Sequence, residues 1–125
     1  VSEAEGVMAH EGYQEYQTLL QSNNISCDIA PVGQALALLR NENPSLWEKL
    51  YSRDDFHPSP HGTLLQACIL YVLITGKEAP EYNAQCWDSC RYMQPPDEDP
   101  LPRPSVEEAE ALRKLAYRIC TTSSL

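Results

Sequence analysis

The chain has 125 residues, of which 42% are hydrophobic, a content that supports a folded core and excludes a disordered chain. Nine Lys and Arg residues against eighteen Asp and Glu residues give a net charge of −9, which repels phosphate backbones and argues against nucleic-acid binding. The longest apolar run, residues 67–74, is far shorter than the roughly 20 residues of a membrane span. We therefore expect one soluble domain, or part of a larger one.

The chain starts at Val1, and its first residues do not resemble a signal peptide. A leader upstream of Val1 would leave no trace in this sequence. The localisation of the protein is therefore left open.

The first part of the chain has the pattern helix, strand, helix. Aromatic and leucine residues spaced along one face predict an amphipathic helix over His10–Ser22. Apolar and polar residues alternate over Ile25–Ala30, which predicts a strand. Pro31 suits the first turn of a second helix, which ends at Asn43-Pro44 and is followed by a short helical turn around Trp47. The apolar face of the second helix consists of Ala35, Leu36, Leu38 and Leu39.

The middle of the chain combines an irregular loop with an apolar helix. Two prolines exclude regular structure from Tyr51–His61. Gly62 opens the next element, a helix over Thr63–Thr75 with Gly76 as its C-cap. Because this helix has almost no polar face, we expect it to be buried on most sides.

Six of the ten prolines lie between Pro80 and Pro104, which predicts an exposed, extended surface excursion over residues 77–104 with no binding role. Ser105 and Glu108 then form a capping box that starts a closing helix over residues 105–122. The apolar face of this helix consists of Ala109, Leu112, Ala116, Ile119 and Cys120.

One strand between helices indicates an α/β layered fold, and because one strand cannot make a sheet, its neighbours must come from elsewhere. We therefore expect residues 1–125 to be only part of one domain. In this interpretation residues 1–76 form the core and the loop, residues 77–104 the excursion and residues 105–122 the closing helix.

Five cysteines are an odd number and a poor disulfide framework. Cys27 and Cys68 have apolar neighbours and are predicted to be small buried hydrophobes. Cys86 and Cys90 are either a pair or two unrelated thiols. A zinc site at these two would need further thiols or histidines close by, and that stretch has none.

The densest group of chemically active side chains lies in the loop before the apolar helix. The spacing of Asp54 and His57 lets a turn bring the carboxylate against one imidazole nitrogen, which fixes the tautomer and stabilises the imidazolium. The other nitrogen is then free to act as a general base near neutral pH. Pro58 restricts the backbone after the histidine.

Two other interpretations of this loop stay open on the residues alone. Asp54 and His57 form a purely structural hydrogen bond in the first. In the second, His57 and His61 ligate a metal with the nearby carboxylates. The second requires a helix, which Pro58 and Pro60 disfavour.

The segment Asp54-Asp-Phe-His-Pro-Ser-Pro-His-Gly-Thr-Leu-Leu-Gln-Ala-Cys-Ile-Leu-Tyr, followed by Leu73-Ile-Thr-Gly-Lys, resembles the C-terminal block of SGNH (GDSL-type) hydrolases. The pattern of that family is D-x-x-H-P-S, a glycine, and a hydrophobic helix that ends in a T-G pair. Ile29-Ala-Pro-Val-Gly-Gln-Ala35 is similar to the family's last core strand and following turn, and Leu112-Arg-Lys-Leu-Ala116 to its closing helix.

The resemblance implies the C-terminal half of a three-layer α/β/α, flavodoxin-like domain of a serine esterase, a half that is mostly helical within these residues. Asp54 is then the triad aspartate and His57 the triad base, whereas Asp55 is a solvent-facing residue at a variable position. His61 has no role in the motif. The implied substrate is an ester-bearing small molecule, an acylated sugar or a lipid, and no metal or cofactor is implied.

The nucleophilic serine and the oxyanion donors of that family are missing from this sequence. No Gly-Asp-Ser block occurs, and Asp88-Ser89 follows the D-x-x-H block, which is the wrong order. We expect these groups to lie upstream, in an N-terminal half that the chain needs, so that residues 1–125 alone are inactive. The alternative is a non-catalytic interaction protein derived from such a domain, in which Asp54 and His57 are structural remnants and the proline-rich loop docks a partner.

Overall fold

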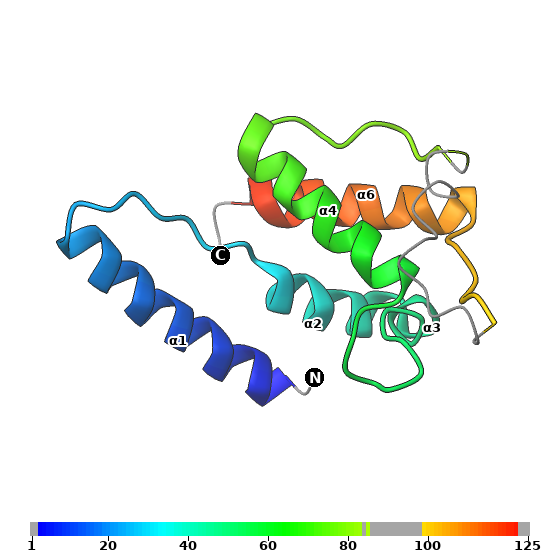
Figure 1. Ribbon diagram of the computed structural model, residues 1–125, viewed down its shortest axis with the longest axis horizontal. Coiled ribbons are helices and arrows are strands. Elements are labelled where there is room, and N and C mark those ends of the chain that lie inside the picture. The colour runs from blue at the N-terminus through cyan, green and yellow to red at the C-terminus, as the bar shows by residue number, and fades with distance from the viewer. Residues whose placement is uncertain (1–2, 84, 86–98, 123–125) are drawn as a thin grey trace.

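The computed structural model (Figure 1) describes residues 3–83, 85 and 99–122. Its elements are helices: α1 Glu3–Ser22, α2 Val32–Glu42, α3 Pro44–Trp47, α4 Pro60–Thr75 and α6 Val106–Thr121. The first helix begins earlier than its sequence pattern predicts. The bounds of the second and last helices agree with prediction within a residue or two.

The prediction of a three-layer α/β/α fold is wrong: the described residues are helical and contain no strand or sheet. Residues 25–30 are not helical, which agrees with their alternating pattern, and they are not a strand either. A strand needs a neighbouring strand to satisfy its backbone N–H and C=O groups. The described residues supply none. Instead, the Gln17 side-chain amide donates a hydrogen bond of 2.8 Å to Cys27 O, which ties this connector to α1.

The core lies where α4 crosses α6, and α2 and α3 close it from one side (Figure 1). Leu65 and Ile69 from α4 meet Leu112 and Ala116 from α6, and all four are fully buried. Burial of a Leu or Ile side chain is worth roughly 1.5–3 kcal/mol. This contact therefore fixes the direction of α4, and with it the loop that precedes α4. The helix α1 contacts α2 and lies at the edge of the molecule.

The prediction that the apolar helix is buried on most sides is wrong. One side of α4 faces the core, whereas Leu70, Leu73 and Ile74 are exposed, Ile74 by 82%. The helix also begins at Pro60 rather than at Thr63. A proline is tolerated in the first turn of a helix, where its missing N–H has no partner to lose, so the second proline of the loop starts the helix.

Both predicted helix ends are confirmed. Gly76 has a left-handed backbone (φ 71°), which a glycine adopts without strain, and it closes α4. At the start of α6, Glu108 N donates to Ser105 Oγ (3.1 Å) and Ser105 N donates to Glu108 Oε1 (2.9 Å). This reciprocal pair is the capping box.

Arg113 on α6 is a buried charge that the sequence pattern did not predict. Its guanidinium donates to Ala79 O from Nε (3.0 Å) and from Nη2 (2.6 Å), and it pairs with Glu110. These bonds hold the segment after α4 against α6. Half of the proline-rich excursion, residues 84 and 86–98, lies outside the described residues, but its ends do not project freely, because Ala79 and Pro104 are buried.

The cysteine predictions are confirmed in part. Cys68 is buried, and burial raises the pKa of its thiol to about 11. Cys27 is only partly buried. Cys86 and Cys90 lie outside the described residues, so their pairing stays a prediction. In the part of the chain that the structure describes, no helix is both long and apolar enough to cross a bilayer.

Candidate catalytic loop

The loop between α3 and α4 folds back on itself in a short turn. Ser52 N donates to His57 O (2.8 Å), and Tyr51 and Pro58 form an antiparallel bridge. At the tip, Asp55 N donates to Ser52 O (3.0 Å), and Asp55 adopts a left-handed backbone (φ 57°), which Asp tolerates better than most residues. This turn brings the side chains of residues 54 and 57 together.

Asp54 organises the turn and holds the imidazole of His57. Its Oδ2 lies 2.6 Å from His57 Nδ1, while its Oδ1 accepts hydrogen bonds from the N–H groups of Phe56 and His57 (both 2.9 Å) and from Ser52 Oγ (2.6 Å). The hydrogen bond with the His57 side chain, followed by those from the Ser52 hydroxyl and the two amides, holds the pKa of the Asp54 carboxyl well below its usual range. Asp54 is therefore ionised at neutral pH.

The second imidazole nitrogen of His57 is open. The His57 side chain is 69% exposed, and no described group is hydrogen-bonded to its Nε2. The ring of Phe56 meets the imidazole edge to face, with ring centroids 5.0 Å apart. An ionised carboxylate on Nδ1 favours the tautomer with a proton on that nitrogen, which leaves a lone pair on Nε2. This is the arrangement that a general base requires.

The residues after His57 fasten the loop to the core. Ser59 is the N-cap of α4: its Oγ accepts from Gly62 N (3.2 Å) and donates to Lys49 O. Ser59 N donates to Leu50 O (2.9 Å). At Gly62, any Cβ would lie far inside contact distance of that same carbonyl oxygen and 3.2 Å from Pro58 Cβ. The Pro-Ser-x-x-Gly part of the motif thus fixes where the carboxylate and imidazole lie.

His61 lies apart from this pair and has a different partner. It is in the first turn of α4 rather than before the helix, it is only 2% exposed, and its Nε2 lies 3.2 Å from Glu108 Oε1. The two histidines therefore do not converge on one site. No group of three His, Cys, Asp or Glu side chains suited to a metal occurs among the described residues.

Glu108 on α6 bonds to Lys49 and His61 and so joins α6 to the region of the loop. The sequence did not reveal this network, because its three members are far apart in the chain. Lys49 Nζ lies 2.6 Å from Glu108 Oε2. Partial burial acts to raise the pKa of Glu108, but hydrogen bonds from Lys49, Ser105 N and His61 outweigh it and lower the pKa to about 2. The carboxylate form is thus favoured in the folded state.

This network predicts a pH-dependent stability. Because the pKa of Glu108 falls from 4.5 to about 2 on folding, the carboxylate stabilises the protein above pH 4.5, and this contribution disappears as the pH falls toward 2. We expect Glu108→Gln to lower the free energy of unfolding by about 1–3 kcal/mol at pH 7, and by about half of that or less at pH 3. Urea unfolding at both pH values measures this. Glu107→Gln, on the same turn but exposed, is the control, and an equal loss in both variants would contradict the account.

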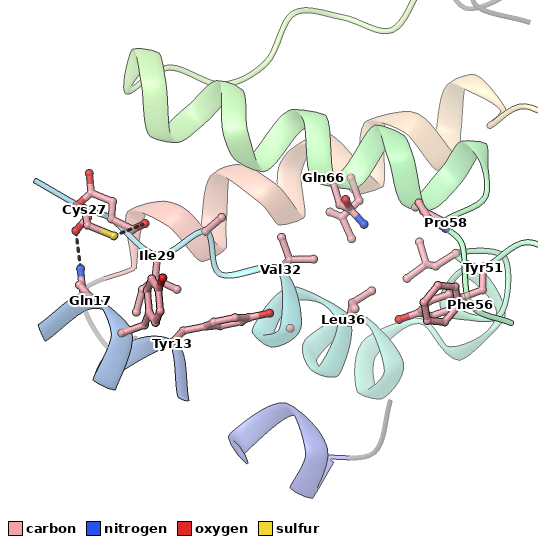
Figure 2. A pocket seen from close by; sticks show the side chains of 17 residues that line it. Tyr13, Gln17, Cys27, Ile29, Val32, Leu36, Tyr51, Phe56, Pro58 and Gln66 are labelled. Atoms are coloured by element: carbon pink, nitrogen blue, oxygen red, sulfur yellow. Dashed lines mark hydrogen bonds between the residues drawn. The ribbon is translucent and has the colours of Figure 1, made fainter. Parts of the chain in front are cut away.

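An apolar groove of about 600 Å³ runs from the loop toward α1 (Figure 2). Tyr51, Phe56 and Pro58 lie at one end, and Tyr13 and Ile29 lie at the other. The remaining lining residues that Figure 2 labels are Gln17, Cys27, Val32, Leu36 and Gln66. The sequence patterns did not predict this groove, because it depends on how α1 is placed against α2.

Comparison of the chain with protein-family models, with curated proteins and with solved structures gives no match. The assignment of a function therefore rests on the geometry of the loop and on the motif resemblance alone.

Proposed function

We propose that Asp54 and His57 are the carboxylate and general base of a serine ester hydrolase. The observation that carries this proposal is the 2.6 Å contact between Asp54 Oδ2 and His57 Nδ1 combined with an open Nε2. The carboxylate favours the tautomer with its proton on Nδ1, and the exposed Nε2 is accessible to a hydroxyl group. The D-x-x-H-P-S resemblance to SGNH hydrolases supports the same assignment.

The reaction that such a pair supports is acyl transfer in two steps. His57 Nε2 accepts the proton of a serine hydroxyl while the serine Oγ attacks the ester carbonyl, and the same proton then passes to the leaving alkoxide as the C–O bond breaks. In the second step Nε2 accepts a proton from water while the water oxygen attacks the acyl-enzyme, and it then returns this proton to the serine Oγ as the acyl C–Oγ bond breaks and the carboxylic acid leaves. Asp54 stabilises the imidazolium that forms in each step. No metal or cofactor takes part.

The serine itself is not among the described groups at the site. Ser52 Oγ donates to Asp54, and Ser59 Oγ bonds to Lys49 O and Gly62 N, so both hydroxyls already serve the loop. Following the resemblance, in which these groups precede the D-x-x-H block, the proposal places the nucleophile and the oxyanion donors upstream of these 125 residues, so that the chain supplies the Asp and His of a triad.

Substitution of Asp54 tests the proposal in the full-length protein. In Asp54→Asn the amide oxygen can still accept the two loop amides, but the amide NH₂ then faces Nδ1 and favours the tautomer with its proton on Nε2. We expect kcat for a p-nitrophenyl ester to fall by about 10²–10⁴-fold. Asp55→Asn removes the same charge from the neighbouring exposed residue and is expected to keep kcat within about threefold of the parent.

The alternative, a non-catalytic interaction protein, is favoured by one observation, the exposed apolar side of α4 formed by Leu70, Leu73 and Ile74. Exposed apolar patches are typical of interaction surfaces. If Asp54→Asn and Asp55→Asn have equal activities, the catalytic proposal fails and this alternative takes its place.

A further inference from the structure

Ser52 binds three residues of the turn that carries the candidate pair. Its backbone N–H donates to His57 O (2.8 Å), its carbonyl accepts from Asp55 N (3.0 Å), and its hydroxyl donates to Asp54 Oδ1 (2.6 Å). The two backbone bonds fix the place of the Ser52 side chain beside the carboxylate. The hydroxyl therefore gives up little conformational freedom when it donates to Asp54.

The Ser52 hydroxyl is one of three donors to a single oxygen of Asp54. The other two are the N–H groups of Phe56 and His57, each 2.9 Å from Oδ1. Three donors on Oδ1 hold the carboxylate in the orientation in which Oδ2 lies 2.6 Å from His57 Nδ1. Because the Asp54 side chain is 50% exposed, water competes for both of its oxygens wherever these donors are lost.

Of these three donors, the hydroxyl alone belongs to a side chain, so a substitution can remove it and leave the other two in place. A hydrogen bond to an ionised acceptor is of the stronger kind. Its influence on Asp54 is also visible in the charge state: after the bond with His57, the bond from Ser52 contributes most to holding the pKa of the Asp54 carboxyl below its usual range.

We propose that Ser52 is a positioning residue, whose hydroxyl keeps the Asp54 carboxylate on His57 Nδ1 and so keeps the lone pair of the base on Nε2. This inference rests on the proposed hydrolase function and gives a role in the reaction to a residue outside the D-x-x-H motif. Ser52 acts through Asp54 alone and transfers no proton. Where the carboxylate turns away from Nδ1, the tautomer with its proton on Nε2 gains population, and that tautomer cannot accept a proton from serine.

Ser52→Ala in the full-length protein removes the hydroxyl and keeps both backbone bonds. We expect kcat for a p-nitrophenyl ester to fall by about 5–20-fold, since a bond to a charged group is lost while two amides still hold Oδ1. The residue is only half-buried, so the variant should fold, and the urea midpoint of the same preparation checks this. Ser52→Thr keeps the hydroxyl and is expected to keep kcat within about threefold of the parent.

The tautomer of His57 supplies a readout that does not depend on hydrolysis. The ¹⁵N chemical shifts of the imidazole, recorded at alkaline pH where the ring is neutral, give the ratio of the form protonated on Nδ1 to the form protonated on Nε2. We expect this ratio to fall by at least about threefold in Ser52→Ala. A Ser52 that only stabilised the turn would lower the urea midpoint and leave the ratio unchanged.

The matched control is Ser45→Ala. Ser45 Oγ also donates to a side-chain oxygen two residues away, Asn43 Oδ1 (3.1 Å), but it lies on α3 outside the turn. We expect this variant to keep both kcat and the tautomer ratio of the parent. Losses in Ser45→Ala equal to those in Ser52→Ala would overturn the inference.

His57→Ala, assayed beside these variants, separates the two proposals. If His57→Ala is inactive while Ser52→Ala keeps kcat or the tautomer ratio of the parent, the role of Ser52 is refuted and the hydrolase function stands. Equal losses in Ser52→Ala and Ser52→Thr would also refute it, because the hydroxyl would then not be the group that matters. Full activity in His57→Ala would refute the hydrolase function itself, and with it the catalytic role of Ser52, whatever the tautomer ratio.

Discussion

Replacement of His57 by alanine in the full-length protein should lower kcat/KM for an ester by about 10²–10⁴-fold, because loss of a general base alone costs that much. The same change should hardly affect folding. The His57 side chain is 69% exposed, and exposed substitutions usually change the free energy of unfolding by less than about 0.5 kcal/mol. Initial rates and the urea midpoint of the same preparation measure both effects.

The matched control is His61→Ala, four residues along the chain, which should show the opposite pattern. His61 is buried and bonded to Glu108, so its removal leaves a cavity and takes one hydrogen bond from a carboxylate that still accepts from Lys49 and Ser105 N, at a cost of about 1–3 kcal/mol of stability. Per folded molecule, the activity of His61→Ala should exceed that of His57→Ala by at least about a hundredfold. Equal losses of activity in the two variants would refute the assignment of His57 as the base.

Gly62→Ala, which adds one methyl group at the start of α4, should destabilise the protein strongly. The new Cβ would lie far inside contact distance of Leu50 O, the carbonyl that also accepts from Ser59 N. Because the obstacle is the Leu50 backbone, with the rigid Pro58 ring beside it, neither can yield easily and the start of α4 must move away from the loop. We expect a loss of about 3 kcal/mol or more in unfolding free energy. We also expect a loss of about 10²-fold in kcat, because a displacement of about 1 Å is enough to misplace a catalytic group.

The control for this variant is Gly12→Ala, on α1. No atom lies within 4 Å of a Cβ at Gly12, so alanine should stabilise the helix by about 0.5–1 kcal/mol. Urea unfolding compares the two alanine variants directly. If Gly62→Ala is as stable as the parent protein, the tight approach of α4 to Leu50 is not a feature of the protein in solution.

The elements that the sequence predicted correctly are the ones specified by neighbouring residues. The capping box of Ser105 and Glu108, the left-handed Gly76 and the turn that joins Asp54 to His57 each depend on side chains within a few positions of one another. In such cases the bond that the pattern requires can form whatever the rest of the chain does. The D-x-x-H spacing indicated that a turn can bring the carboxylate against the imidazole, and the structure has the two atoms 2.6 Å apart.

The incorrect predictions concern features that depend on distant partners. Alternation over Ile25–Ala30 describes a segment suited to a sheet, but a strand exists only if another strand pairs with it, and no described segment does. The apolar side chains of α4 likewise show that the helix can be buried, but they do not show whether another element packs on each of its sides. Ile74, on a side that no described element covers, is exposed. The Lys49, His61 and Glu108 network and the apolar groove were missed because their members meet only in the folded chain.

The central claim, that these residues supply the base and not the nucleophile of a serine hydrolase, is tested most directly by labelling with a fluorophosphonate, which reacts with activated serines. We expect labelling of the full-length protein at one serine upstream of these 125 residues, at a rate that His57→Ala lowers by at least about a hundredfold. The chain of residues 1–125 alone should not be labelled. Labelling of a serine within residues 1–125, or labelling at the same rate in His57→Ala, would contradict the account.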